Sequence, residues 1–140
     1  MTSLFVDTNI IIDLLAKRQG FYESASVLFS SADNREVELL ISALTFANTN
    51  YILSKLMSAK EARDTLRKFK VLVRIVSSND KIIDLALSDS SFPDLEDGLQ
   101  YYTALEHHAE IIITRNKKDF KGAALPIMNA NDYLAFVKNK

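Results

Sequence analysis

The sequence predicts a three-layer α/β/α sandwich with a central parallel sheet. Three observations support this prediction: the strand candidates are continuous apolar runs, segments with helical spacing separate them, and residues suited to capping precede most of those segments. Continuous apolar strands are typical of a sheet that helices cover on both faces. The 140 residues contain no repeat and no linker, so we expect a single domain over residues 1–140.

The first half of the chain alternates between strand and helix candidates. The apolar run 3–7 ends in an Asp, and the segment IIIDLLAK that follows has helical spacing. A second helical segment begins at Phe21. The run 37–41 predicts the second strand, and Ser42 is suited to cap the helix after it.

The second half continues this alternation. Ser58 and Glu61 have the spacing of a capping box before another helical segment, and the run 71–76 predicts a third strand. The remaining candidates are, in order, a helix capped by Ser78 or Asn79, a helix from Asp94, a strand at 111–114, a short strand near 126–128 and a helix from Asn129 or Asn131.

The composition excludes several classes of protein. The absence of Cys excludes disulfide scaffolds and Cys-based zinc sites, and the 3 Gly are too scattered for a phosphate-binding glycine loop. The formal net charge of -1 gives no overall positive field, so a nucleic acid would have to be bound by local groups. No signal segment and no apolar run of roughly 20 residues is present, and we therefore expect a soluble, cytoplasmic protein without a membrane partner.

Polar side chains are concentrated where the predicted strands end. The carboxyl ends of parallel strands meet at one edge of a sheet, where such folds bind their ligands. Carboxylates gathered there raise one another's pKa unless a cation lies between them. Oxygen ligands favour a hard ion, so we expect Mg²⁺ or Mn²⁺. The residues at this edge are Asp7, Asn48, Asp94, Glu96, Asp97, Thr114, Asn116 and Asp119.

Each of these residues also has a purely structural interpretation. Asp7 stands where a helix cap is expected, and the acids at 94–97 complement the positive end of a helix. The Asn and Asp within 116–119 are typical turn residues. Outside this set, the spacing of Asp13 and Lys17 predicts a solvated ion pair on a helix. A function therefore has to rest on the whole set of residues.

Four motifs resemble those of the PIN domain, the fold of many bacterial toxin ribonucleases. The motifs are FVDTNIIIDLL, ISALTFAN, DLEDGLQYYTAL and IIITRNKKDF, in this order and over nearly the whole chain. The resemblance implies a parallel sheet between helices and an acidic cluster that binds Mg²⁺ or Mn²⁺ and cuts RNA. On this resemblance the first, third and fourth family acids are Asp7, Asp97 and Asp119. Thr114 and Asn116 would line the same site.

The second acid of the family is replaced in this chain. Relatives usually carry a Glu in the helix after the second strand, and Asn48 stands at that position here. An amide oxygen can bind a metal ion but brings no charge, so we expect weaker binding of the cation. Glu96 and Asp94 are candidates to supply the missing charge, and we count both as possible metal ligands.

The motifs and the residues at the sheet edge are compatible with three functions. The leading one is a metal-dependent endoribonuclease that hydrolyses RNA phosphodiester bonds with a metal-activated water. The alternative, motivated by Asn48, is a degenerate PIN domain that binds RNA or a protein partner without cleaving. A phosphotransfer domain with Asp7 as nucleophile is the third, but a second acid two residues later is missing. The resemblance also implies a homodimer and, for the toxin of a toxin-antitoxin pair, an antitoxin protein.

Contacts to the substrate are assigned to polar and basic side chains around the acids. Uncharged groups would position the attacking water or a phosphate oxygen, and cations would bind phosphates. A second group of cations, between 63 and 74, is a further candidate phosphate contact. The predicted substrate-binding residues are Asn48, Thr114, Asn116, Arg115, Lys117 and Lys118.

Overall fold

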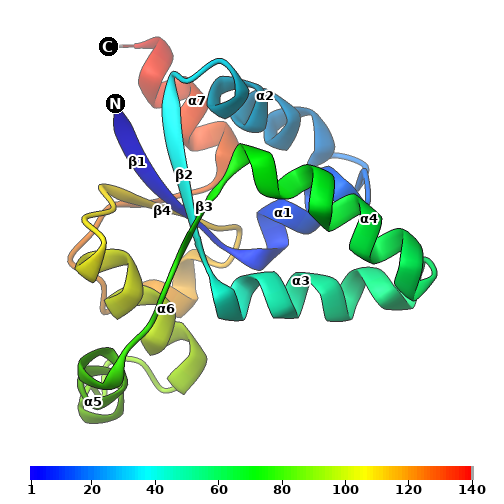
Figure 1. The fold of residues 1–140 in the computed structure, drawn as a ribbon. Helices are drawn as coiled ribbons and strands as arrows, with labels where there is room; N and C mark the ends of the chain where they lie inside the picture. Colours follow the sequence, from blue (N-terminus) through cyan, green and yellow to red (C-terminus); the bar gives the residue numbers. More distant parts are fainter. Residues whose placement is uncertain (140) are drawn as a thin grey trace.

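A five-stranded parallel sheet forms the middle layer of the fold (Figure 1). The computed structural model describes residues 1–139. The strand order is β3-β2-β1-β4-β5, and all neighbouring strands are parallel. At the centre of the sheet, Phe5 is paired with Leu40 on one side and with Ile112 on the other. The strands are β1 (Thr2–Val6), β2 (Val37–Ser42), β3 (Arg74–Val76), β4 (Ile111–Ile113) and β5 (Ile127–Met128).

Helices cover both faces of this sheet, as the three-layer prediction requires. The 3-10 turn η1 (Lys70–Leu72) leads into β3, and the 3-10 turn η2 (Lys117–Phe120) lies between β4 and β5. No helix in the described part of the chain is long and apolar enough to cross a membrane. The helices are α1 (Thr8–Leu15), α2 (Tyr22–Asp33), α3 (Ala43–Leu56), α4 (Ala59–Phe69), α5 (Asp80–Ser88), α6 (Leu95–Glu106) and α7 (Ala130–Lys138).

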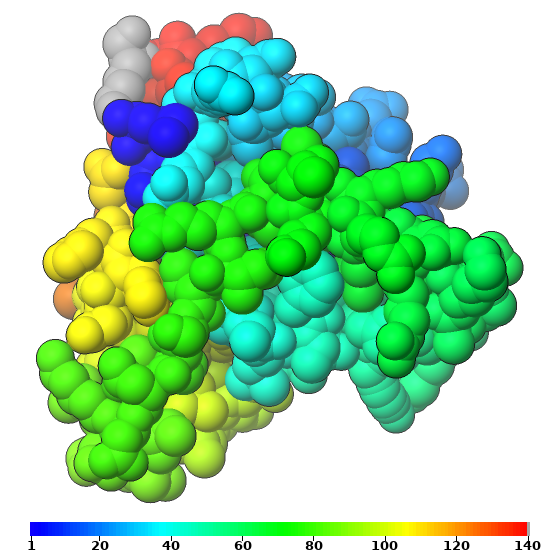
Figure 2. All heavy atoms as spheres, in the orientation of Figure 1, coloured from blue at the N-terminus to red at the C-terminus, as the bar shows by residue number. Residues whose placement is uncertain are grey.

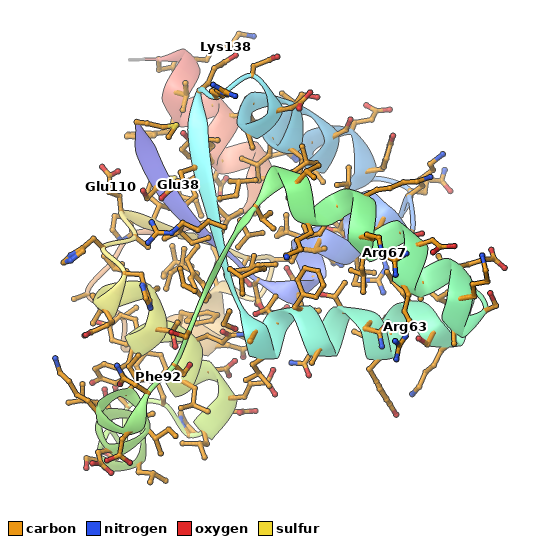
Figure 3. All side chains as sticks on the ribbon, in the orientation of Figure 1. Glu38, Arg63, Arg67, Phe92, Glu110 and Lys138 are labelled. Atoms are coloured by element: carbon orange, nitrogen blue, oxygen red, sulfur yellow. The ribbon has the colours of Figure 1, made fainter. Side chains whose placement is uncertain are left out.

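The two faces of the sheet bury separate apolar cores. Leu4 and Val6 pack with residues of α1, α2, α3, α4 and α7, whereas Phe5 between them packs with residues of α6. This division follows from the alternation of side chains along a strand. Figure 3 shows Phe92, which belongs to the second core, near α5 and α6, and Arg67 on α4 at the other side of the view.

The helix caps confirm most of the boundaries expected from the sequence. The Ser42 hydroxyl accepts a hydrogen bond from the Thr45 amide at 3.0 Å, and Ser58 accepts one from the Glu61 amide at 3.1 Å. The Glu61 carboxylate does not close a reciprocal capping box, because it accepts a hydrogen bond from the Ser58 hydroxyl instead. A complete capping box occurs at the start of α7, where Asn129 is the cap.

The third strand is shorter than predicted. The prediction covered 71–76, but Lys70–Leu72 continue α4 as a 3-10 turn and β3 begins only at Arg74. β3 is an edge strand whose pairing with β2 starts at Leu40 and Arg74, although β2 itself begins at Val37, because the backbone at Lys70–Leu72 is held in the 3-10 turn. Val71 is 84% exposed, which explains why its apolar character does not extend the strand.

α3 and α4 pack against each other as a helical hairpin. Figure 1 shows the two helices side by side, and Figure 2 shows that together they form a lobe projecting from the body of the molecule. α3 begins directly after the carboxyl end of β2. The first turns of α3 therefore lie at the edge of the sheet where the site is predicted.

Candidate functional site

A cleft of about 370 Å³ opens at the carboxyl edge of the sheet. Asp7 comes from the end of β1, Asp97 from the first turn of α6 and Asp119 from η2, so three segments distant in sequence contribute one acid each. The complete lining consists of Asp7, Thr8, Asn9, Ile12, Arg18, Asn48, Tyr51, Ile52, Glu96, Asp97, Asn116 and Asp119.

Asp7 is both a helix cap and a member of this cleft. Its Oδ1 accepts a hydrogen bond from the Thr8 amide at 2.8 Å, and its Oδ2 accepts one from the Thr114 hydroxyl at 2.8 Å. Burial raises the pKa of Asp7, and repulsion from Asp119 adds to the effect, while the two hydrogen bonds oppose it. The structural and functional interpretations of Asp7 are therefore compatible, since the cap holds the carboxylate in place.

Asp97 has the most perturbed carboxylate of the cleft. Its pKa rises from the ordinary value of 3.8 to about 7. Burial is the largest cause, followed by repulsion from Asp94, Asp119, Asp7 and Glu96. Clusters of like charge with strongly shifted pKa values are a mark of functional sites and of sites that bind cations.

Asn48 faces the acidic cluster, as the motif predicts. Its Nδ2 donates a hydrogen bond to Glu96 Oε1 at 2.7 Å, which joins α3 to the first turn of α6. Glu96 therefore lies beside the position where relatives are expected to carry the second acid. Asp94 has a different place: it is outside the cleft lining and caps α6 by accepting a hydrogen bond from the Glu96 amide at 2.8 Å.

Thr114 and Asn9 connect the acids to the loop after β4. The Thr114 hydroxyl donates to Asp7 and accepts from the Asn116 amide at 3.0 Å. Asn9 lies 3.4 Å from both Asp7 Oδ2 and Thr114 Oγ1, and its own Oδ1 accepts from the Arg115 amide at 3.2 Å. This network positions the backbone that leads to η2 and Asp119.

The predicted solvated pair of Asp13 and Lys17 is wrong. The Asp13 side chain is 2% exposed and accepts two hydrogen bonds from the Arg115 guanidinium, at 2.8 and 3.0 Å. Arg115 also lies over the Phe21 ring, 4.0 Å from its centroid. A carboxylate that leaves water needs a partner of opposite charge, and here the partner comes from the β4 loop.

The cations expected to contact phosphates lie outside the cleft lining. Arg115 is held by Asp13, and Lys117 pairs with Asp132 of α7, whereas Lys118 is exposed. The second group is also elsewhere, because part of it lines a separate hollow between α3 and α4; Figure 3 labels two of these side chains. The cations of that hollow are Arg63, Arg67 and Lys70.

Six residues that line the cleft were not among the predicted site residues: Thr8, Asn9, Ile12, Arg18, Tyr51 and Ile52. Tyr51 lies three residues after Asn48 on α3, and this helical spacing was a usable signal that both face the same side. Arg18 lies in the turn after α1, where no periodic pattern indicates the direction of a side chain.

The cleft suits a cation by charge, although its side chains are not arranged as a finished coordination shell. Over residues 1–139, no three acidic or histidine side chains are arranged so that they could hold one metal ion. The donor set nevertheless consists of carboxylate and amide oxygens, which hard divalent cations prefer. Such a cation would relieve the repulsion that, after burial, contributes to the raised pKa of Asp97.

The chain is similar in sequence and fold to several known proteins. Ribonuclease VapC1 of Aquifex aeolicus is 26% identical over 133 residues, covering 93% of this chain and 92% of that protein. The toxin-antitoxin complex from Klebsiella pneumoniae contains a chain with 25% identity and a TM-score of 0.67, over 92% of this chain and 98% of that one. VapBC-1 from nontypeable Haemophilus influenzae has 18% identity and a TM-score of 0.70, over 93% and 99%. The model of the PIN domain matches residues 3–118, and this chain belongs to the PIN-domain family.

Proposed function

We propose that this protein is a divalent-metal-dependent endoribonuclease that hydrolyses RNA phosphodiester bonds. The observation that supports it is the meeting of Asp7, Asp97 and Asp119 from three distant segments in one cleft, where burial and then mutual repulsion raise the pKa of Asp97. The similarity to Ribonuclease VapC1 agrees with this chemistry.

Because their side chains do not form a finished coordination shell, Asp7, Asp97 and Asp119 would hold a Mg²⁺ or Mn²⁺ ion partly through bound water, with Glu96 as a further candidate ligand. When bound, such an ion supplies a water of lowered pKa and stabilises negative charge on phosphate oxygens. The hydrogen bonds from Thr8 and Thr114 keep the Asp7 carboxylate in a fixed orientation toward the cleft.

The amide of Asn48 serves two purposes in this proposal. It holds Glu96 at 2.7 Å, and it adds an uncharged oxygen that can orient water. The carboxylate of Glu96 then supplies the charge that Asn48 lacks.

The test is cleavage of a fluorescent pool of RNA sequences by the purified protein, with Mn²⁺ and with a chelator. We expect cleavage that needs Mn²⁺ and disappears in Asp7→Asn, which preserves the helix cap. The matched control is Asp84→Asn, which removes an exposed carboxylate of α5. Protein that folds but cleaves no RNA with Mn²⁺ would contradict the proposal.

Calorimetry distinguishes the nuclease from the alternative, a degenerate domain that binds without cleaving. A heat of Mn²⁺ binding that is lost in Asp119→Ala supports a working metal site. RNA binding without any heat from Mn²⁺ favours the alternative, whose motivation is Asn48.

We further propose that the protein acts as the toxin of a toxin-antitoxin pair, as a homodimer. The similarity to a chain of the toxin-antitoxin complex from Klebsiella pneumoniae supports the toxin role, and the homodimer rests on the family resemblance. Growth arrest on expression, relieved by Asp7→Asn, is the expected result, and light scattering measures the oligomeric state.

A further inference from the structure

Arg18 provides a positive charge on the wall of the acidic cleft. Its side chain is 42% exposed, and the turn after α1 directs it to the cleft. The nearest carboxylate oxygen, Asp13 Oδ1, is 3.9 Å from Arg18 Nη1, which is beyond hydrogen-bond distance. Arg18 is therefore held near Asp13 by charge alone.

Asp13 already has another partner, the Arg115 guanidinium. Both of its oxygens accept hydrogen bonds from Arg115, at 2.8 and 3.0 Å. Within the described residues, the side-chain nitrogens of Arg18 donate no hydrogen bond to the protein. A guanidinium with free donors suits the paired oxygens of a phosphate. Without such a cation, the acids of the cleft would repel a phosphate.

Tyr51 supplies a second kind of contact on α3. Tyr51 is 54% exposed, and it lines the cleft one helical turn after Asn48. Lys55 Nζ lies 4.2 Å from the centroid of the ring, so a positive charge already covers part of it. An exposed aromatic ring beside cations is a typical platform on which nucleic acid bases stack.

We propose that Arg18 and Tyr51 bind one nucleotide unit of single-stranded RNA beside the acids, with Arg18 on the phosphate and Tyr51 on the base. This inference rests on the proposed ribonuclease function and names its substrate contacts. Single strands are favoured because the bases of a duplex stack on each other and leave no free face for Tyr51.

The experiment measures the binding of a short fluorescent single-stranded RNA of mixed sequence by anisotropy, with Mn²⁺. All variants carry Asp7→Asn, so binding is measured without cleavage. Arg18→Gln is expected to weaken binding about tenfold and to reduce the slope of log K against log salt by about 0.7, the value for one phosphate contact on a single strand. Tyr51→Leu is expected to weaken binding at least about fivefold without changing that slope.

Two further variants serve as controls for the loss of a positive charge. Lys17→Gln removes a neighbouring cation that is not in the cleft lining, and it should change neither the affinity nor the slope. Arg18→Lys keeps the charge, so it should keep the salt slope while losing part of the affinity. Circular dichroism checks that each variant is folded.

The outcomes separate this inference from the proposed function. If RNA is cleaved with Mn²⁺ but Arg18→Gln behaves like Lys17→Gln, or Tyr51→Leu changes nothing, the inference is overturned and the ribonuclease function stands. Equal binding of a duplex of the same sequence would overturn the role of Tyr51. If the protein neither binds nor cleaves RNA, both proposals fail.

Discussion

Replacing Asp97 by Asn is expected to stabilise the metal-free protein at alkaline pH. The pKa of Asp97 rises from 3.8 to about 7, first because of burial and then because of repulsion from neighbouring acids. The native protein therefore keeps a proton on Asp97 at pH values where the unfolded chain has lost it. By linkage, the free energy of unfolding falls as the pH rises between those two values, and it is level above about 7.

The size of the effect follows from the same two values. Their difference corresponds to about 4 kcal/mol at 1.36 kcal/mol for each tenfold change in the ionisation constant. Asp97 is only partly buried, and solvent screening reduces this figure to about 1–2 kcal/mol. Asp97→Asn removes both the cost of burying a charge and the repulsion, so its stability should exceed that of the wild type by this amount at pH 8. At pH 4 the two proteins should be nearly equal.

Urea unfolding at pH 4, 6 and 8 in the presence of a chelator measures this difference. Asp84→Asn on α5 is the control, and it should show no such dependence on pH. Adding Mn²⁺ at pH 8 should stabilise the wild type more than Asp97→Asn, because a ligand that binds only the native state raises its stability. The reasoning is refuted if Asp97→Asn is less stable than the wild type at pH 8, or if the difference does not change with pH.

Three other substitutions test a buried ion pair, a tight packing contact and the cleft itself. Asp13→Ala leaves the Arg115 guanidinium without its carboxylate and should lower the free energy of unfolding by about 3 kcal/mol in urea titrations; a change below 1 kcal/mol would contradict the buried pair. Gly122→Ala places a methyl carbon 2.8 Å from Ser91 Cβ, so it should destabilise the protein by about 1–3 kcal/mol, and the double variant with Ser91→Gly should recover part of the loss in thermal unfolding. Asn48→Glu adds a carboxylate beside the α6 glutamate that Asn48 contacts, and calorimetry should show tighter Mn²⁺ binding; unchanged affinity would place position 48 outside the metal site.

The fold could be predicted because its signals are local. The run 37–41 and the cap at Ser42 lie next to each other in sequence, and each reports one element without reference to the rest of the chain. The third strand was overestimated because the helix before it continues further than its sequence pattern indicates. Val71 has strong β propensity, but its backbone belongs to the 3-10 turn that follows α4, and the residue is exposed.

The edge where the acids gather could be predicted as well, since parallel strands bring their carboxyl ends together. Asp7, Asp97 and Asp119 indeed line one cleft, whereas their role as metal ligands stays a prediction. Asp94 shows the limit of this reasoning. It belongs to the same acidic run as Asp97, but capping α6 keeps it out of the cleft lining, and the sequence does not reveal which of two neighbouring acids turns inward.

The cations could not be assigned, because their partners lie far away in sequence. The spacing of Asp13 and Lys17 indicates a helical pair only if the helix continues, but α1 ends at Leu15 and Lys17 adopts a φ of 51°. Asp13 is then free to be buried, and burial requires a strong partner, which Arg115 supplies from a distant loop. Both oxygens of Asp13 accept from Arg115, and Arg18 lies beyond hydrogen-bond distance of Asp13, so Arg18 keeps its hydrogen-bond donors for the cleft. The pairing that removes Arg115 from the predicted phosphate contacts is thus the same pairing that makes Arg18 available for that role.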